Sequence, residues 1–153
     1  DMPDWIINAS CFIGFFLLWE GVAWFTHKYI MHGFLWAWHK DHHEPGYKRF
    51  EKNDLFGVVF AGLSVLLIVL GAESRDWRFW SGLGIAAYGA AYFFVHDIFV
   101  HQRLKWFTRT NNRYLMALRK AHKIHHKKLG KEDGEAFGFL FVHRKYWPKK
   151  NNV

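Results

Sequence analysis

Histidine is the residue type whose spacing in this chain points to chemistry. Ten of the eleven histidines fall into two copies of one pattern, H-x4-H followed by H-x-x-H-H. The first copy comprises His27, His32, His39, His42 and His43, and the second comprises His96, His101, His122, His125 and His126. Neutral imidazole is a good ligand for iron and zinc. The repeated, spaced set therefore predicts a metal centre, whereas His143 stands outside the pattern and is predicted not to be a ligand.

The spacing within each pattern predicts how the imidazoles point. On an α-helix, residues at i, i+3 and i+4 share one face, so H-x-x-H-H should aim three imidazoles the same way. Two histidines in H-x4-H would be about 140° apart around the helix. They would flank a stripe of the helix surface, and each could reach a different metal ion.

The number of imidazoles favours two metal ions. A structural zinc ion is satisfied by four ligands, whereas two ions with about five imidazoles each would leave positions open for oxygen. The Glu-x-x-His motif of soluble di-iron bundles and the H-E-x-x-H motif of zinc proteases do not occur in the sequence. A purely structural role for ten histidines is disfavoured, because each copy begins at the end of an apolar stretch.

Three carboxylates are candidates for orienting the imidazoles, since metal-bound histidines usually donate their second N–H to a carboxylate or carbonyl. Asp41 lies inside the first H-x-x-H-H, and Asp97 follows His96. Each could equally be a solvated neighbour. Glu20 precedes His27 by seven residues, which places it on the same helix face, about 10 Å deeper in an apolar segment. An ionisable group at that depth is a candidate for function.

The elements that must position the histidines are predicted to be membrane helices. Residues 5–26, 54–73 and 78–98 each approach the roughly 20 apolar residues that span a bilayer. We therefore expect an all-α bundle of about three transmembrane helices in a single domain, residues 1–153, with a histidine-rich helical cap formed by residues 27–53 and 99–153. Within it, Asn53 and Asp54 would cap the second span, and residues 114–126 would form an amphipathic helix.

Charge predicts the orientation of this bundle. Two spans separate the two histidine copies, so an even number of crossings places both on one side. Basic residues such as Lys28, Lys40 and Arg103 flank the histidine-bearing ends, and the positive-inside rule then puts the histidines in the cytoplasm. The net charge of +8 suits membrane lipids or an acidic protein partner better than nucleic acid, because it borders the apolar segments. The single cysteine supports neither a disulfide framework nor a cysteine metal site.

Four stretches resemble the bacterial beta-carotene hydroxylases, small members of the fatty acid hydroxylase superfamily. They are HKYIMHGFLWAWHKDHHEP (27–45), FEKNDLFGVVFA (50–61), FVHDIFVHQR (94–103) and AHKIHHKKLGKEDGEAFGFL (121–140). The resemblance implies 3-hydroxylation of a carotenoid in the bacterial inner membrane, with beta-carotene passing through beta-cryptoxanthin to zeaxanthin. It also implies two iron ions held by the ten motif histidines, molecular oxygen, and electrons from a ferredoxin-type donor. The likeness fades from Val142.

Alternatives and details remain open at this point. Zinc could replace iron, and a fatty-acid or sterol-type hydroxylase or desaturase would use the same metal chemistry on another lipid. A metal transporter would instead place ligands along its spans. Aromatic residues near the motifs could line a slot for the polyene ring or form an interfacial belt: Phe34, Trp36, Trp38, Phe93 and Phe94. Basic residues around the last motif could dock the electron donor or attract lipid headgroups: Arg119, Lys120, Lys123, Lys127, Lys128 and Lys131.

Overall fold

The protein is described by a computed structural model that places residues 3–44, 46 and 50–149. These residues form helices joined by loops, with no strand among them, so the predicted all-α class is confirmed. In chain order the elements are α1 (Asp4–Phe25), η1 (Thr26–Phe34), α2 (Trp36–His43), α3 (Asp54–Gly71), α4 (Trp77–Tyr92), η2 (Phe93–Val100), α5 (Arg113–His125) and η3 (Arg144–Tyr146).

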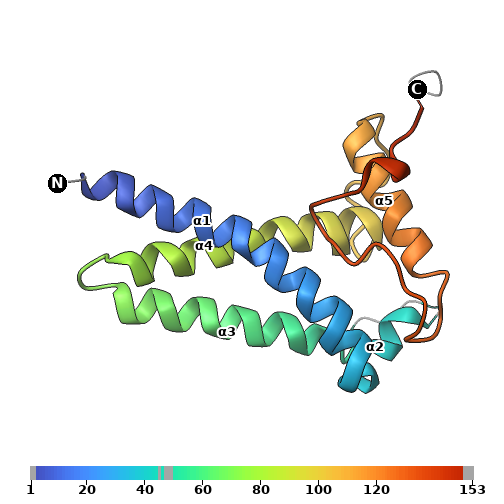
Figure 1. The fold of residues 1–153 in the computed structure, drawn as a ribbon, viewed down its shortest axis with the longest axis horizontal. Helices are drawn as coiled ribbons and strands as arrows, with labels where there is room; N and C mark the ends of the chain where they lie inside the picture. The colour runs from blue at the N-terminus through green and yellow to red at the C-terminus, as the bar shows by residue number, and fades with distance from the viewer. Residues whose placement is uncertain (1–2, 45, 47–49, 150–153) are drawn as a thin grey trace.

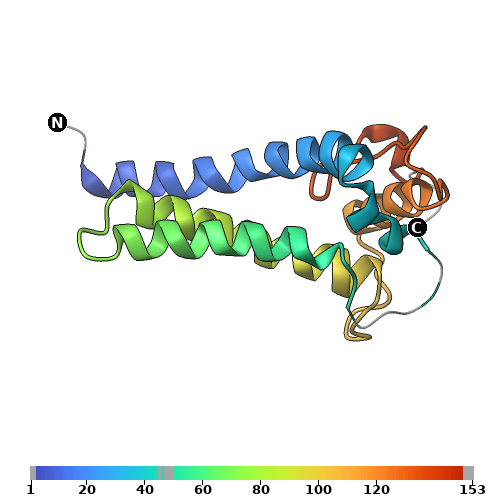
Figure 2. The same ribbon diagram turned by 90° about the horizontal axis from the view of Figure 1, so that it is seen from below.

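The long helices α1, α3 and α4 lie side by side and give the molecule its elongated shape (Figures 1 and 2). The turn between α3 and α4 lies at the same end as the N-terminus, while α2 and α5 lie together at the other end. Helix α4 packs against both α1 and α3. The cap is thus built at one end of the bundle, as the even number of crossings between the histidine copies requires.

Among the described residues, three helical segments are long and apolar enough to cross a membrane: Asp4–Phe34, Asp54–Gly71 and Trp77–Val100, with 31, 18 and 24 residues. Large apolar side chains cover their outward faces; on α3 these include Val58, Val65 and Val69, each more than half exposed. Lipid is the natural environment for such a surface. The protein is therefore a membrane protein. The first and third segments are longer than a bilayer requires, so their helices continue into the cap, as predicted.

Small residues bring the three helices close together. A β-carbon at Gly84 of α4 would collide with the backbone carbonyl of Phe12 on α1, and one at Gly82 would lie 2.8 Å from the carbonyl oxygen of Ser64 on α3. The Ser64 hydroxyl donates to the Gly82 carbonyl at 2.8 Å. Close backbone approach at small residues is how transmembrane helices pack when water does not drive them together.

The cap has its own apolar core. Val95 of η2 packs there against Leu118 of α5 and against Val142 and Tyr146 of the C-terminal segment. The segment after Val142 thus contributes buried side chains to the cap. Arg119 of α5 fastens this helix to the end of η2, because its guanidinium donates to the carbonyls of Phe99 and Thr108 at 2.8 and 2.9 Å.

Candidate metal centre

The structure brings all ten motif histidines together in the cap, in two neighbouring groups. The first imidazole group has five members with ligand nitrogens within 4.8 Å of one another, and the second has four: His27, His32, His39, His43 and His125 in the first, and His42, His101, His122 and His126 in the second. His96 joins the second group, since its Nε2 lies 3.2 Å from Nε2 of His42. His143 belongs to neither group and instead accepts a hydrogen bond from the backbone N–H of Lys145 at 3.2 Å.

Each H-x-x-H-H motif serves both groups. His39 and His43 lie on one side of α2 and enter the first imidazole group, while His42 enters the second. On α5, His125 enters the first imidazole group and its neighbour His126 enters the second. The three imidazoles of a motif do point into one region, as predicted, but they are divided between two positions there. Each half of the chain therefore contributes to both groups.

The two H-x4-H motifs lie in π-helix, and this corrects the predicted angle between their imidazoles. His27 and His32 lie within η1, and the N–H of His101 donates to the carbonyl of His96, five residues earlier, at 2.9 Å. A helix with i to i+5 hydrogen bonds turns less per residue than an α-helix, so residues five apart align. His27 and His32 accordingly share the first imidazole group instead of serving different positions.

The imidazoles of the first group are oriented through their Nδ1 atoms, four of them by backbone carbonyls. These carbonyls belong to residues 128–142, named here the C-terminal strap. The pairs are His43 with Lys128 at 2.9 Å, His32 with Lys131 at 3.1 Å, His125 with Glu135 at 2.8 Å and His27 with Phe137 at 2.9 Å. A carbonyl can only accept, so each Nδ1 carries the proton and each Nε2 keeps its lone pair.

Asn53 orients the fifth imidazole of this group. Nδ1 of His39 lies 2.6 Å from Oδ1 of Asn53. Asn53 does precede α3, but its side chain makes no capping hydrogen bond with that helix. Asn53 therefore occupies the predicted N-cap position of α3, but its amide oxygen accepts from a buried imidazole N–H and not from the helix.

Carboxylates orient two members of the second group. Nδ1 of His42 lies 2.7 Å from Oε2 of Glu51, a contact that the sequence analysis missed. Nδ1 of His96 lies 3.3 Å from Oδ2 of Asp97, whose other oxygen accepts from Arg103 at 2.7 Å. Asp97 thus lies where an orienting carboxylate was predicted. Asp41 instead accepts the backbone N–H of Lys52 at 2.7 Å.

Burial disfavours the charged form of several imidazoles in the two groups, because it lowers their pKa. Burial, together with the neighbouring imidazoles, lowers the pKa of His39 to about 2 and that of His125 to about 3. Burial likewise lowers the pKa of His42 and His122 well below the ordinary value. Neutral imidazole is the form that binds metal. Lone pairs that converge at about 3.2 Å, as those of His32 and His125 do, are a donor set that a cation would satisfy.

Aromatic rings close off the space around the two groups. Phe139 stacks on His27 with ring centres 5.0 Å apart, and Tyr92 stacks on His96 at 4.7 Å. Phe137 packs edge-on against both His32 and His125 at 5.2 Å. These three rings were not among the aromatic residues expected from the sequence.

The expected aromatic residues divide between the centre and the surface. Trp36 does contact the imidazoles, with its ring 5.1 Å from that of His32. Phe34, by contrast, is 80% exposed, and Phe93 and Phe94 also face outward. Trp38 packs on Phe56. These outward-facing rings therefore suit an interfacial belt better than a slot beside the imidazoles.

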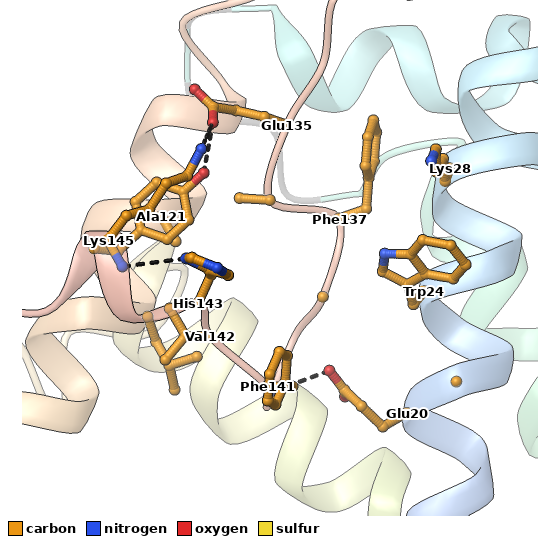
Figure 3. Close-up of a pocket in the computed structure, with 15 residues that line it drawn as sticks. Glu20, Trp24, Lys28, Ala121, Glu135, Phe137, Phe141, Val142, His143 and Lys145 are labelled. Atoms are coloured by element: carbon orange, nitrogen blue, oxygen red, sulfur yellow. Dashed lines mark hydrogen bonds and ion pairs between the residues drawn. The ribbon is translucent and has the colours of Figure 1, made fainter.

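A cavity of about 550 Å³ lies between α1, α5 and the C-terminal strap. Figure 3 shows its walls, with Glu20 and Trp24 on α1 facing the strap and Lys145 and Glu135 paired on the other side. None of the motif histidines lines it, although Glu135 and Phe137 both line it and orient imidazoles through their carbonyls. Among the described contacts, the Glu20 carboxylate accepts hydrogen bonds from the backbone of the strap and none from an imidazole.

Comparison with known proteins places this centre in a family. The family model described as fatty acid hydroxylase matches residues 12–146, which include all ten grouped histidines. The chain belongs to the fatty acid hydroxylase family. The comparison with solved structures found no match to this chain.

Several curated relatives are similar over most of this fatty acid hydroxylase. A beta-carotene hydroxylase of Pantoea ananas is 47% identical over 90% of the chain and 79% of its own length. That of Pseudescherichia vulneris is 42% identical over 91% of the chain and 79% of its own length. A chloroplastic beta-carotene 3-hydroxylase of Arabidopsis thaliana is 37% identical over 66% of the chain and 34% of its own length.

Replacing Glu51 should weaken metal binding at the second imidazole group. Without its acceptor, His42 is free to turn, and losing such an orienting partner typically costs about 10- to 100-fold in metal affinity. We expect Glu51→Ala to lose about one metal ion per chain to a chelator at a concentration that leaves the unaltered protein loaded. Glu132→Ala, at an exposed position of the strap, is the matched control. Equal metal retention in both variants would contradict the role given to Glu51.

Proposed function

We propose that this fatty acid hydroxylase hydroxylates the rings of beta-carotene at C3, forming beta-cryptoxanthin and then zeaxanthin. The observation that carries the proposal is the 40–47% identity to bacterial proteins named beta-carotene hydroxylase, over most of the chain. Two plant relatives carry the name beta-carotene 3-hydroxylase, which supports the choice of C3. The imidazole groups supply a centre suited to oxidative chemistry.

The proposed cofactor is a pair of iron ions, one held by each imidazole group. The donor set fits: it consists of buried, neutral imidazoles whose Nδ1 protons point outward to fixed oxygens in the first group. Bound iron would supply the activation of O2 with two electrons, so that one oxygen atom enters the substrate and the other leaves as water. Zinc suits the same ligands but carries no redox chemistry, so it would yield an inactive protein.

The chain's own task in this reaction is to position the ring and exclude water. C3 of the ring is not allylic whereas C4 is, so hydroxylation at C3 must be imposed by placement and not by bond strength. Phe139 and Tyr92 stack on imidazoles of the two groups and also pack against each other, with ring centres 4.7 Å apart. Rigid rings at this position would hold a flat apolar substrate and keep bulk water from the centre.

The geometry of the membrane limits how the substrate is presented. Helices α2 and α5, which carry imidazoles of both groups, lie at one end of the long helices, while a carotenoid is about as long as a bilayer is thick. One ring would reach the centre from the bilayer with the polyene trailing along the helices. The second ring would need a separate binding event, since the other end of the molecule is then remote from the metal. Release between the two steps follows from this geometry.

The proposed location is the bacterial inner membrane with the centre at its cytoplasmic face, where a ferredoxin-type protein would deliver electrons. The support is the basic surface formed by α5 and the residues that follow it, on which Lys120, Lys123 and Lys127 are exposed. Arg119 does not belong to this surface, because its guanidinium is engaged with backbone carbonyls. A fatty-acid or sterol-type hydroxylase is the alternative within the same family, with the same centre acting on another lipid.

Product analysis tests the substrate. In cells that make beta-carotene, expression of this chain should produce beta-cryptoxanthin first and zeaxanthin later, because each ring requires its own binding event. The measurement is a time course of extracted carotenoids, with and without the chain. Zeaxanthin forming with no free intermediate would contradict release between steps. Unchanged carotenoids beside newly hydroxylated fatty acids or sterols would establish the alternative.

Histidine substitutions test the ligand assignment. His125→Ala should remove a ligand of the first imidazole group, lower iron from two ions per chain towards one, and reduce hydroxylation at least 100-fold. His143→Ala should retain both iron and activity, since His143 lies outside both groups. Iron is measured by elemental analysis of purified protein, and activity by product formation. An inactive His143→Ala beside an active His125→Ala would overturn the assignment.

Charge reversal tests docking of the electron donor. If an acidic donor binds the basic surface, Lys120→Glu combined with Lys123→Glu should raise its KM several-fold, and added salt should raise KM in the unaltered protein. The assay uses neutral lipid, so that attraction to anionic headgroups cannot contribute. Arg75→Glu, at an exposed position in the turn between α3 and α4 at the opposite end, is the control. The same KM in all three proteins would rule out docking at this surface.

A further inference from the structure

Glu20 is an acidic side chain within the first membrane-spanning helix, and its carboxylate holds the C-terminal strap by its backbone. Oε1 accepts the N–H groups of Phe139, Leu140 and Phe141 at 2.9, 3.0 and 2.9 Å. Oε2 accepts the hydroxyl of Tyr88, on α4, at 2.6 Å. Figure 3 shows the side chain reaching from α1 to the strap beside Phe141. Both oxygens act as acceptors, which is what an ionised carboxylate offers.

The arrangement is a small anion-binding concavity. Successive backbone N–H groups that converge on one point bind an oxyanion, and here the anion is supplied by a helix more than a hundred residues away in the sequence. Gly138 permits the close approach: a β-carbon there would lie 2.8 Å from the carbonyl oxygen of Phe141 and 3.2 Å from Oε1 of Glu20. The strap is thus shaped to fit the carboxylate.

The same stretch of strap orients the first imidazole group. The Phe137 carbonyl, two residues before the first N–H that Glu20 binds, accepts from Nδ1 of His27 at 2.9 Å. The Glu135 carbonyl accepts from Nδ1 of His125 at 2.8 Å. The ring of Phe139 stacks on His27 at 5.0 Å. One partly buried carboxylate therefore fixes the backbone on which two imidazoles and one stacking ring depend.

We propose that Glu20 is a positioning residue for the metal centre, which acts through the backbone of the C-terminal strap and touches neither metal nor substrate. It anchors residues 139–141, and this anchorage holds the carbonyls of Glu135 and Phe137 in register with His125 and His27. The role differs from a direct hydrogen bond to a ligand imidazole. It rests on the proposed function only for the identity of the metal, since any ion bound by these imidazoles would sense the strap.

The test is substitution of Glu20 by glutamine in the full chain, loaded with cobalt(II) in detergent. Glutamine keeps the size but replaces one acceptor oxygen with an NH2 group, so the backbone N–H groups and the Tyr88 hydroxyl can no longer all donate to this side chain as they do to the carboxylate. Gly138→Ala disturbs the same strap from its own side. Ser64→Ala is the control, because it removes a buried hydrogen bond between α3 and α4 that is remote from the strap.

Folded Glu20→Gln and Gly138→Ala should both alter the visible ligand-field bands of cobalt and weaken its binding about 10-fold for one of two ions. Ser64→Ala should keep the bands and affinity of the unaltered protein even if it melts earlier. A folded Glu20→Gln protein with unaltered bands and affinity would overturn the proposal. Should Glu20→Gln fail to fold, unaltered bands in Gly138→Ala would overturn it equally.

Carotenoid turnover is measured separately on the iron-loaded proteins. A normal cobalt response together with absent carotenoid hydroxylation in the unaltered chain would refute the proposed substrate and leave the role of Glu20 standing. Carotenoid hydroxylation by the unaltered chain, with no change of cobalt bands in either strap variant, would support the proposed substrate and refute the role of Glu20. The two readouts therefore separate a failure of this inference from a failure of the proposed function.

Discussion

The centre depends on one repeated interaction, the donation of an imidazole Nδ1–H to an oxygen that the fold holds in place. Such a hydrogen bond fixes both the tautomer and the rotation of the ring, and leaves Nε2 free to bind a metal ion. Every member of the first imidazole group makes it: Nδ1 of His39 uses the side chain of Asn53, and the other four use the strap. Where the oxygens lie decides where the lone pairs converge.

The need for oxygens at fixed positions explains why the three membrane helices are combined with the strap, a long segment with little regular structure. A helix satisfies its own carbonyls, so it has few to offer to side chains. The strap leaves its carbonyls free, and Glu20 and the cap core then hold it in place, with Leu140 packed against both the bundle core and the cap core. The membrane helices and the irregular segment thus depend on each other: the first and third membrane helices carry His27, His32 and His96 into the cap, and the strap orients four imidazoles of the first group.

Residue type and spacing predicted which side chains gather, because the imidazoles and the apolar spans are written directly in the sequence. The helical class, the three spans and the separation of His143 from the groups follow from such patterns. The placing of both members of an H-x4-H pair in the same imidazole group does not follow from these patterns. It arises because the backbone at His27 and His96 is π-helical and not α-helical as assumed. Backbone acceptors such as the Phe137 carbonyl carry no residue-type signal at all. The position of Asn53 before a helix predicted a capping side chain, but its amide oxygen accepts from the buried His39 imidazole instead.

The repeated motif nevertheless yields two unlike positions. The first imidazole group is anchored by neutral oxygens, whereas two members of the second group, His42 and His96, are anchored by the carboxyl groups of Glu51 and Asp97. A carboxylate anchor makes an imidazole a stronger donor. Arg103 balances part of this negative charge through Asp97 and Asp54, while burial raises the pKa of Glu51 to about 7. A duplication of histidine spacing therefore does not imply duplicated electrostatics, because the residues that set the charge around each group lie outside the motif.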